Sequence, residues 1–270
     1  MINLKKFLTA ICVCFILFAA YIISLPAPQG VMILEYHTIT DAPDEDAKKY
    51  SITPKDFREQ LQYLKDNGYE TISMRDFMLA KKGKLPLPPK PIILTFDDGY
   101  EDNYSTLLPM LEEFGMKATV YMITNNIGKK GYLTLEQLKD MEKRGVEIGS
   151  HTANHIPLTE LSTEKQAEEI KLSKLGLEWK GLKTIYTFSY PNGAYNDNLP
   201  SLLKENEYLT AVTGEPGIND FNTNPFLLHR THIIKPTFGL LEFRYRLLKS
   251  EIYAKLGLYN KTNTYERREI

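Results

Sequence analysis

Two pairs of residues in this 270-residue chain have types and spacing suited to metal-assisted hydrolysis. Asp97 and Asp98 are adjacent and are followed by Gly99, while His151 and His155 are spaced i, i+4. Two carboxylates this close are unfavourable unless a cation or a shared proton relieves them. Two His and one Asp would complete the three protein ligands of a catalytic zinc site. The second Asp would stay free to take a proton from water, whose pKa the metal lowers to about 7.

Each motif alone also has an ordinary structural explanation. A His-x-x-x-His spacing is often one face of a surface helix, and Asp97-Asp98-Gly99 could be a polar turn. A calcium loop over residues 97–102 lacks the ligand spacing of that motif. Because both motifs follow predicted strands in a chain with 5 His, the pair together is far more specific for a metal site than either motif alone.

The elements that must position these residues alternate between strand and helix. Strands are predicted at 31–37, 70–72, 91–94, 117–123, 146–149, 185–190, 209–213 and 226–234, and helices at 53–67, 74–81, 103–114, 134–145, 163–176, 196–206 and 240–256. This alternation predicts an α/β fold with a parallel sheet, either a barrel or a doubly wound sheet. The absence of a Gly-rich dinucleotide fingerprint, and polar clusters that follow strands, favour a barrel.

The N-terminus predicts a membrane anchor. Lys5 and Lys6 precede an uncharged run over 7–25, long enough to span a bilayer core of about 30 Å. We interpret 1–25 as a cytoplasmic stub and single transmembrane signal-anchor, 26–30 as a linker and 31–270 as one catalytic domain. The flanking lysines place that domain outside the cytoplasm. A cleaved signal peptide, giving a secreted protein, is the alternative.

The charge and cysteine content of the chain limit which partners and metal ligands are expected. With 25% charged residues and a net charge of -1, the chain lacks the basic stripe of a nucleic-acid binder, and we expect no nucleic-acid partner. The 2 Cys, Cys12 and Cys14, lie in the apolar segment, so any metal must be held by His, Asp or Glu.

These motifs carry a family resemblance. Residues 95–100 (TFDDGY) and 151–155 (HTANH) resemble the first two motifs of the polysaccharide deacetylases, the NodB-homology carbohydrate esterases, and 188–193 (FSYPNG) resembles the third. Residues 36–39 (YHTI) resemble a signature of the branch that acts on poly-β-1,6-N-acetylglucosamine. The resemblance, over most of residues 31–235, implies a distorted (β/α)7 barrel that hydrolyses N-acetyl groups of a hexosamine polymer and releases acetate.

The resemblance also implies residue roles. Asp97 would be the general base, and Asp98, His151 and His155 would bind a divalent metal, with zinc preferred over other transition-metal ions. A backbone N–H near Asn192 would help to stabilise the oxyanion. The candidate substrate-binding residues are Tyr100, Tyr190, Pro191, Asn192 and Gly193.

Two positions depart from the family pattern. Many members carry an Arg two residues before the Pro of the third motif, where this chain has Ser189, so we expect Arg230 to supply a guanidinium to Asp97. The general-acid histidine is ambiguous among His37, His229 and His232. The last two, three residues apart, cannot both point inward on a regular strand. We prefer His37 because of the Tyr-His-x-Ile resemblance, although each could be a structural histidine.

The sequence thus predicts a membrane-tethered, metal-dependent N-deacetylase that acts on an extracytoplasmic acetylated polysaccharide. The alternatives are a catalytically inactive, membrane-tethered relative that binds glycan, and a deacetylase of peptidoglycan rather than of exopolysaccharide. The C-terminal helix, predicted at 240–256, carries Leu241, Tyr245, Leu248 and Ile252 on one face in a basic region. Such a helix could rest on an anionic membrane or wall polymer, or could simply be solvated.

Overall fold

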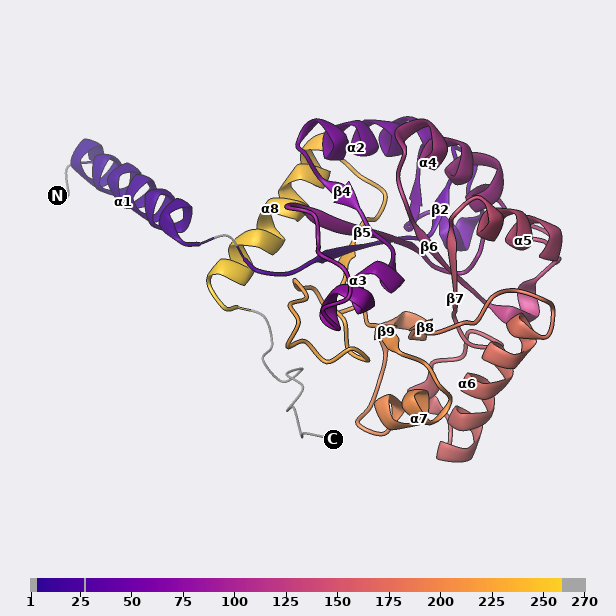
Figure 1. The fold of residues 1–270 in the computed structure, drawn as a ribbon. Helices are drawn as coiled ribbons and strands as arrows, with labels where there is room; N and C mark the ends of the chain where they lie inside the picture. The colour runs from indigo at the N-terminus through magenta and orange to yellow at the C-terminus, as the bar shows by residue number, and fades with distance from the viewer. Residues whose placement is uncertain (1–3, 27, 259–270) are drawn as a thin grey trace.

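A computed structural model describes residues 4–26 and 28–258 of the chain. The first three residues of the predicted stub, Ala27 of the predicted linker and residues 259–270 of the predicted domain lie outside this description. A curled, parallel, 8-stranded sheet occupies the centre of the molecule, with helices packed around its outer face (Figure 1). Its strand order is β10-β1-β5-β6-β7-β8-β9, with β4 paired to β5. The predicted α/β barrel is confirmed.

The elements follow the predicted alternation. The sheet contains β1 (Met32–Tyr36), β4 (Glu70–Thr71), β5 (Pro91–Phe96), β6 (Thr119–Met122), β7 (Glu147–Ser150), β8 (Thr187–Ser189), β9 (Thr210–Val212) and β10 (Thr231–His232), while β2 (Thr38–Ile39) and β3 (Ser51–Ile52) form a separate pair. The helices are α1 (Leu4–Ser24), α2 (Pro54–Asp66), α3 (Met74–Lys81), α4 (Leu108–Phe114), α5 (Leu135–Lys143), α6 (Thr163–Glu178), α7 (Leu199–Glu205) and α8 (Leu240–Lys255). A π-helical turn, Asn103–Leu107, precedes α4.

Local sequence signals explain where these helices begin. Thr53 caps α2 by accepting a hydrogen bond from the Asp56 N–H, with Pro at the first helical position. Thr134 and Gln137 form the predicted reciprocal capping box at the start of α5. Each cap satisfies backbone donors that the helix itself leaves unpaired.

The predicted strand over 226–234 is wrong in extent, because this segment crosses between two strands. Leu228 pairs with Val212 of β9, and Thr231 pairs with Leu34 of β1 on the other edge of the sheet. The segment therefore closes the curled sheet without running beside one strand for its whole length. Arg230 lies at the crossing, with its side chain 1% exposed.

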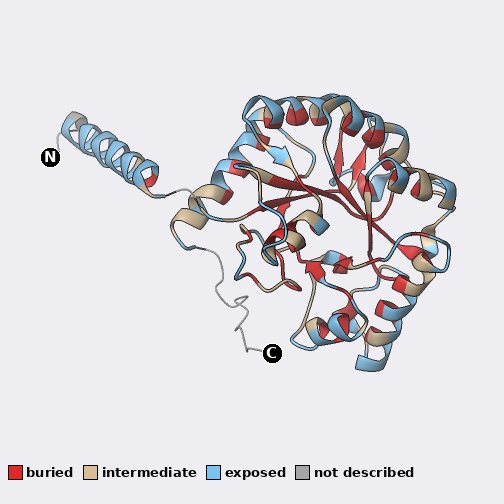
Figure 2. Cartoon of the chain, in the orientation of Figure 1, coloured by how far each residue is buried: buried red, intermediate tan, exposed pale blue. Residues whose placement is uncertain are grey.

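Alternate residues of the strands form two separate apolar clusters. Ile33, Ile93, Tyr121 and Val212 pack with residues of α3 on the inner face of the sheet, and a larger cluster lies between the outer face and the surrounding helices. Figure 2 shows most of the central strands buried, whereas the short strand β4 at the edge is partly exposed. Gly149 of β7 leaves room for the Tyr121 ring, whose Cδ1 would lie 2.5 Å from an added Cβ. The inner cluster thus forms an apolar floor beneath the polar side chains of the next layer.

The N-terminal helix α1 extends away from this domain (Figure 1). Among the described residues, Lys6–Ser24 is the one helical stretch with the length and composition to cross a membrane. Both a membrane anchor and a signal peptide fit these properties.

Candidate active site

The polar residues predicted from the sequence meet where the parallel strands end. Asp97 follows β5, and its N–H donates to the Tyr36 carbonyl oxygen at 2.9 Å, which continues the pairing with β1. The backbone then enters the left-handed region at Asp98 (φ 74°) and Gly99 (φ 76°). This turn breaks the strand alternation that would otherwise direct the two carboxylates to opposite faces. A side chain at Gly99 would collide with Met122 Sδ.

Asp98, His151 and His155 converge as a group of potential metal ligands, whose ligand atoms all lie within 4.8 Å of one another. Asp98 Oδ1 lies 3.6 Å from His151 Nε2 and 3.3 Å from His155 Nε2. His151 Nδ1 lies 2.8 Å from the Ser189 carbonyl oxygen, which can only accept. In the neutral ring Nδ1 therefore carries the proton, and the Nε2 lone pair points toward Asp98.

The donor set fits a divalent cation. Asp98 Oδ1 is buried and has no hydrogen-bond partner among the described residues. A buried carboxylate oxygen without a donor is unfavourable, and the two nearby imidazole nitrogens can add lone pairs rather than relieve it. A cation held by one carboxylate and two imidazoles resolves this arrangement and has the ligand types that zinc accepts.

The two histidines lie on a loop, so the alternative of a helix face does not apply. Thr152 (φ 63°) and His155 (φ 60°) have left-handed backbones. Glu169 of α6 accepts hydrogen bonds from the Ala153 and Asn154 N–H groups, each at 3.1 Å. The His155 N–H donates to Thr152 Oγ1 at 2.9 Å. The helix behind the loop thus fixes the loop through its backbone. The sequence reasoning missed Glu169.

Asp97 has a different environment from its neighbour. Arg230 donates two parallel hydrogen bonds to it, from Nη1 to Oδ1 at 2.8 Å and from Nη2 to Oδ2 at 2.9 Å. Ser189 Oγ donates to Oδ2 at 3.0 Å, so the residue at the family Arg position also contacts Asp97. Burial alone would raise the pKa of Asp97, but the charge and hydrogen bonds of Arg230 outweigh it and hold that pKa well below its usual range. Asp97 is therefore a fixed, ionised carboxylate.

Glu35 completes this network and was missed from the sequence. Its Oε2 lies 3.0 Å from Arg230 Nε, and its Oε1 lies 2.9 Å from His232 Nδ1. His232 Nε2 lies 2.7 Å from the Gly214 carbonyl oxygen. Because both neighbours of the imidazole are acceptors, the ring carries a proton on each nitrogen, and the hydrogen bond to Glu35 raises the pKa of His232. An acid inside an otherwise apolar predicted strand was the signal that could have identified Glu35.

The three candidate general-acid histidines occupy different surroundings. His37 lies beside Asp97: ligand atoms of Glu35, His37 and Asp97 are within 4.8 Å of one another. Its ring stacks on Tyr50 with centroids 4.7 Å apart, and Nδ1 has no hydrogen-bond partner among the described residues. His229 is buried against Gly217, outside both ligand groups identified in the described chain. Both ring nitrogens of His232 already contact acceptors, on Glu35 and Gly214.

The predicted substrate-binding residues separate into core and surface. Tyr190 is 0% exposed and its hydroxyl donates to the Phe226 carbonyl oxygen at 3.0 Å, so its side chain belongs to the core. Pro191 is buried, Gly193 is half-buried, and Asn192 is exposed with a left-handed backbone (φ 56°). Tyr100 is half-buried, and burial together with Asp98 raises the pKa of its hydroxyl. Tyr100 remains a neutral hydrogen-bond donor beside the proposed ligand.

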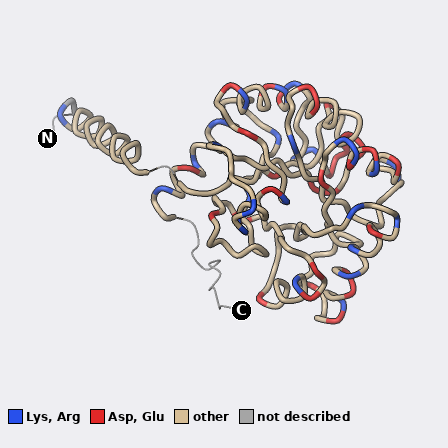
Figure 3. The backbone as a smooth tube through the Cα atoms, viewed as in Figure 1, with Lys and Arg blue, Asp and Glu red and all other residues tan. Residues whose placement is uncertain are grey.

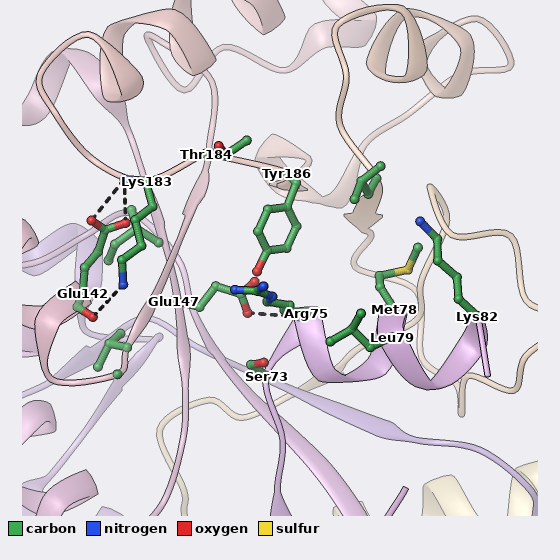
Figure 4. A pocket seen from close by; sticks show the side chains of 14 residues that line it. Ser73, Arg75, Met78, Leu79, Lys82, Glu142, Glu147, Lys183, Thr184 and Tyr186 are labelled. Carbon is green, nitrogen blue, oxygen red and sulfur yellow. Dashed lines mark hydrogen bonds between the residues drawn. The ribbon is translucent and has the colours of Figure 1, made fainter. Parts of the chain in front are cut away.

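A cavity of about 480 Å³ lies apart from this site, at the amino-terminal ends of the strands (Figure 4). Glu147, at the start of β7, lines it together with Arg75 and Tyr186. Glu147 Oε2 accepts from the Met74 N–H at 2.8 Å and from Thr119 Oγ1 at 3.0 Å. Glu147 thus accepts hydrogen bonds from backbone N–H groups at the start of α3. None of the predicted site residues lines the cavity.

The comparisons with known proteins identify a family. A family model described as "Polysaccharide deacetylase" matches residues 84–211. YxkH of Bacillus subtilis, a polysaccharide deacetylase by name, is 34% identical over 76% of this chain and 72% of its own length. The poly-β-1,6-N-acetyl-D-glucosamine N-deacetylase of Staphylococcus epidermidis is 28% identical over 60% of this chain and 61% of its own length.

A solved structure extends the agreement to the fold. The Streptococcus pyogenes deacetylase PplD in complex with acetate is 31% identical, with a TM-score of 0.73 over 83% of this chain and 99% of that one. The match therefore includes nearly all of that deacetylase. By sequence and by fold, the chain belongs to the polysaccharide deacetylase family.

Proposed function

We propose that this protein is a membrane-tethered, metal-dependent N-deacetylase of an extracytoplasmic N-acetylhexosamine polymer. The observation that carries the proposal is that the two adjacent carboxylates, Asp97 and Asp98, have different contacts. Asp98 faces two imidazole nitrogens and has an oxygen without a hydrogen bond, while Asp97 is held by a guanidinium. One carboxylate can therefore bind the metal while the other accepts a proton, and metal-assisted hydrolysis of an amide requires both functions.

The residues divide the reaction between them. Asp98, His151 and His155 would hold the cation, which when bound supplies Lewis acidity to the acetamide carbonyl and acidifies water. Asp97 accepts the proton of the attacking water. Arg230 and Ser189 fix the orientation of Asp97 and keep it ionised, so that it is available as a base at neutral pH.

Breaking the C–N bond requires a proton on the departing amine, and we assign this step to His37. The ring is half-buried beside Asp97, and stacking on Tyr50 fixes its plane. The donated proton gives a free amine on the sugar, while the acetyl carbon leaves as acetate. His232 is less suited, because both its nitrogens already face acceptors. The exposed turn at Asn192, next to buried Pro191, would help to hold the acetamide oxygen.

We assign the substrate to the poly-β-1,6-N-acetylglucosamine class, with peptidoglycan as the alternative. The resemblance at residues 36–39 and the printed activity of the S. epidermidis relative support this assignment. The apolar helix α1 supports action at the outer surface of the membrane, because such polymers lie outside the cytoplasm. Secretion after signal cleavage is the alternative location.

Acetate release by the full chain in detergent tests the proposal. The substrates are oligomers of β-1,6-N-acetylglucosamine and peptidoglycan fragments, with metal content measured on the same sample. We expect stoichiometric divalent metal, activity that is lost on chelation and returns on reloading, and preference for the β-1,6 oligomers. Metal bound without acetate release from either substrate would favour the inactive glycan-binding relative.

A further inference from the structure

The C-terminal helix α8 has two apolar faces, and only one of them packs against the domain. Phe243 and Leu247 are buried, at 1% and 2% exposure. Leu241, Tyr245 and Leu248, spaced i, i+4 and i+7, are 66%, 61% and 53% exposed. The sequence predicted these three on one face, and the structure turns that face to solvent. Three large apolar side chains aligned on one helix face mark an interaction surface rather than scattered exposure.

Exposed apolar side chains continue beyond both ends of this helix. Phe238, just before α8, is 72% exposed, and Leu258, just after it, is 59% exposed. We call Phe238, Leu241, Tyr245, Leu248 and Leu258 the apolar stripe. Its members lie on the first half of α8 and just beyond each end of the helix. A helix that lies along an interface presents an apolar face of this kind.

Basic side chains border the apolar stripe on both sides. By helical periodicity, Arg244 and Lys255 lie along one edge and Lys249 along the other. The neighbouring acids are engaged elsewhere: Glu242 pairs with Arg246 at 2.6 Å, and Glu251 accepts from Tyr69 at 3.2 Å. Long basic side chains beside an apolar face place their charges at headgroup level while their stems cover hydrocarbon.

The position of α8 relative to α1 indicates what covers the apolar stripe. α8 lies on the side of the domain from which α1 projects, and it runs across the direction of α1 rather than continuing it (Figures 1 and 3). Lys255 Nζ donates to the carbonyl oxygen of Ile22, in the last turn of α1, at 3.1 Å. If α1 spans a bilayer, its last turn lies at the membrane surface, and this contact places the end of α8 at the same depth.

We propose that α8 is an interfacial helix, whose apolar stripe inserts into the outer leaflet of an anionic membrane beside α1. The inference rests on the proposed anchoring by α1. An interfacial α8 would set the orientation of the domain relative to the membrane. A single spanning helix with a short linker would leave the domain free to rotate. A second, lateral attachment sets one orientation, and so sets the height and direction from which the polymer reaches the active site.

Lipid fits the surface better than the other occupants. A wall polymer offers negative charge but no hydrocarbon, and it would leave Leu241, Tyr245 and Leu248 in water. A second copy of the chain would have to bring the basic borders of two stripes together, which like charges oppose. An anionic leaflet provides hydrocarbon for the stripe and headgroups for its borders.

Depth-dependent fluorescence quenching tests the insertion. The full chain, with Trp179 replaced by Phe, carries a single probe, either Leu248→Trp on the stripe or Leu172→Trp on α6, where Leu172 is 49% exposed. Both proteins are placed in phosphatidylcholine–phosphatidylglycerol vesicles with and without brominated acyl chains. Because an interfacial helix buries its apolar face about 5–10 Å into the boundary, we expect the α8 probe to lose about half of its emission and the α6 probe little.

Two further variants separate the parts of the proposal. Arg244→Gln with Lys249→Gln should reduce quenching of the α8 probe in anionic vesicles, and high salt should do the same. Leu241→Ser with Tyr245→Ser should reduce the hydrogen-exchange protection of α8 in vesicles while α1 keeps the protein in the membrane. An unquenched α8 probe, or one protected through concentration-dependent self-association, would overturn the interfacial helix.

Acetate release from a short soluble oligomer, measured in the same vesicles, keeps the two proposals distinguishable. Quenching without acetate release would leave the interfacial helix standing and contradict the proposed function. Acetate release without quenching would support the proposed function and contradict the interfacial helix.

Discussion

Two buried carboxylates, at opposite ends of the same barrel, show what separates a reactive site from a structural one. Asp97 lies at the carboxyl ends of the strands and faces Arg230, while Glu147 lies at the amino ends and accepts hydrogen bonds from Met74 and Thr119. Burial pushes both pKa values upward. At Asp97 the guanidinium outweighs burial and the pKa is lowered, whereas at Glu147 hydrogen bonds do not offset burial and the pKa is raised.

The surroundings of the two acids differ as clearly as their pKa values. Beside Asp97 lie two groups of converging ligand atoms and an unsatisfied Asp98 oxygen. Beside Glu147 lies a cavity of about 480 Å³, and Glu147 accepts through Oε2 from the start of α3 and from Thr119 of β6. The cavity beside Glu147 therefore does not mark the reactive end of the barrel. Convergent lone pairs and a fixed, ionised base identify the end that can do chemistry.

The largest expected effect comes from the Asp97 side of this comparison. Asp97→Asn keeps the size of the side chain but removes the proton acceptor, and general-base loss costs about 10²–10⁴-fold. We expect kcat for acetate release to fall by about 10³-fold, with divalent metal content unchanged because Asp98, His151 and His155 remain. Single-turnover acetate release and metal analysis measure the two quantities. An Asp97→Asn protein with more than about a tenth of normal kcat would remove Asp97 from the role of base.

Arg230 should affect both stability and rate. Arg230→Met leaves Asp97 and Glu35 as buried carboxylates without their shared cation, and removing one partner of a buried pair costs about 3–5 kcal/mol. Denaturant unfolding should show this loss. Arg230→Lys, which keeps the charge but not the two parallel hydrogen bonds, should recover most of the stability and less of kcat. Equal recovery of both would mean that the bidentate geometry has no role in orienting Asp97.

The histidine variants separate an acid from a structural residue. His37→Ala should lower kcat by about 10²-fold with a small change in KM, because proton donation to the leaving amine is a transition-state interaction. His229→Ala, which removes a buried ring packed on Gly217, should lower the free energy of unfolding more than it lowers kcat. A normal rate for His37→Ala would refute our assignment. Oligomers with better leaving amines should partly rescue the His37 variant and leave the His229 variant unchanged.

Much of this arrangement was accessible from the sequence because it depends on local signals. Strand-end positions of Asp97, Asp98 and His151 followed from apolar runs and glycines, and the starts of α2 and α5 followed from their capping residues. The anticipated contact between Arg230 and Asp97 is present in the structure, because the crossing segment turns that side chain inward. The role of each residue in catalysis remains a prediction.

Other features depended on tertiary context that no local pattern contains. Residues 226–234 have strand-like composition, but closing the barrel makes them change partner, so only Thr231–His232 pairs as a strand. The third-motif Tyr190 enters the core through its hydroxyl contact with Phe226. Periodicity placed Leu241, Tyr245 and Leu248 on one face of α8 but could not show that Phe243 and Leu247, on another face, are the residues that pack against the domain. The role of Glu35 could not be predicted, because its partners Arg230 and His232 are distant in the sequence.

His232 predicts a pH dependence of stability. Because its folded pKa is raised above the ordinary 6.5, its contribution is fully present below pH 6.5 and is lost as pH rises through the folded pKa. We expect His232→Gln to be less stable than the wild type by about 1 kcal/mol near pH 6 and nearly equal to it at high pH, since the ring is 44% exposed and screened. Urea unfolding across this range measures the difference. A gap that widens as pH rises would contradict a protonated His232.

The smallest effect is expected at the other carboxylate. Glu147→Gln keeps an oxygen to accept from Met74 and Thr119, so we expect normal kcat and a change below about 1 kcal/mol in unfolding free energy. Because the folded pKa of Glu147 is raised above the ordinary 4.5, the folded state binds its proton more tightly, and wild-type stability falls as pH rises from 4.5 through that folded pKa. The Gln variant should lose this decline. If Glu147→Gln lowered kcat as Asp97→Asn does, the amino-terminal end would also take part in the chemistry, and the contrast between the two carboxylates would fail.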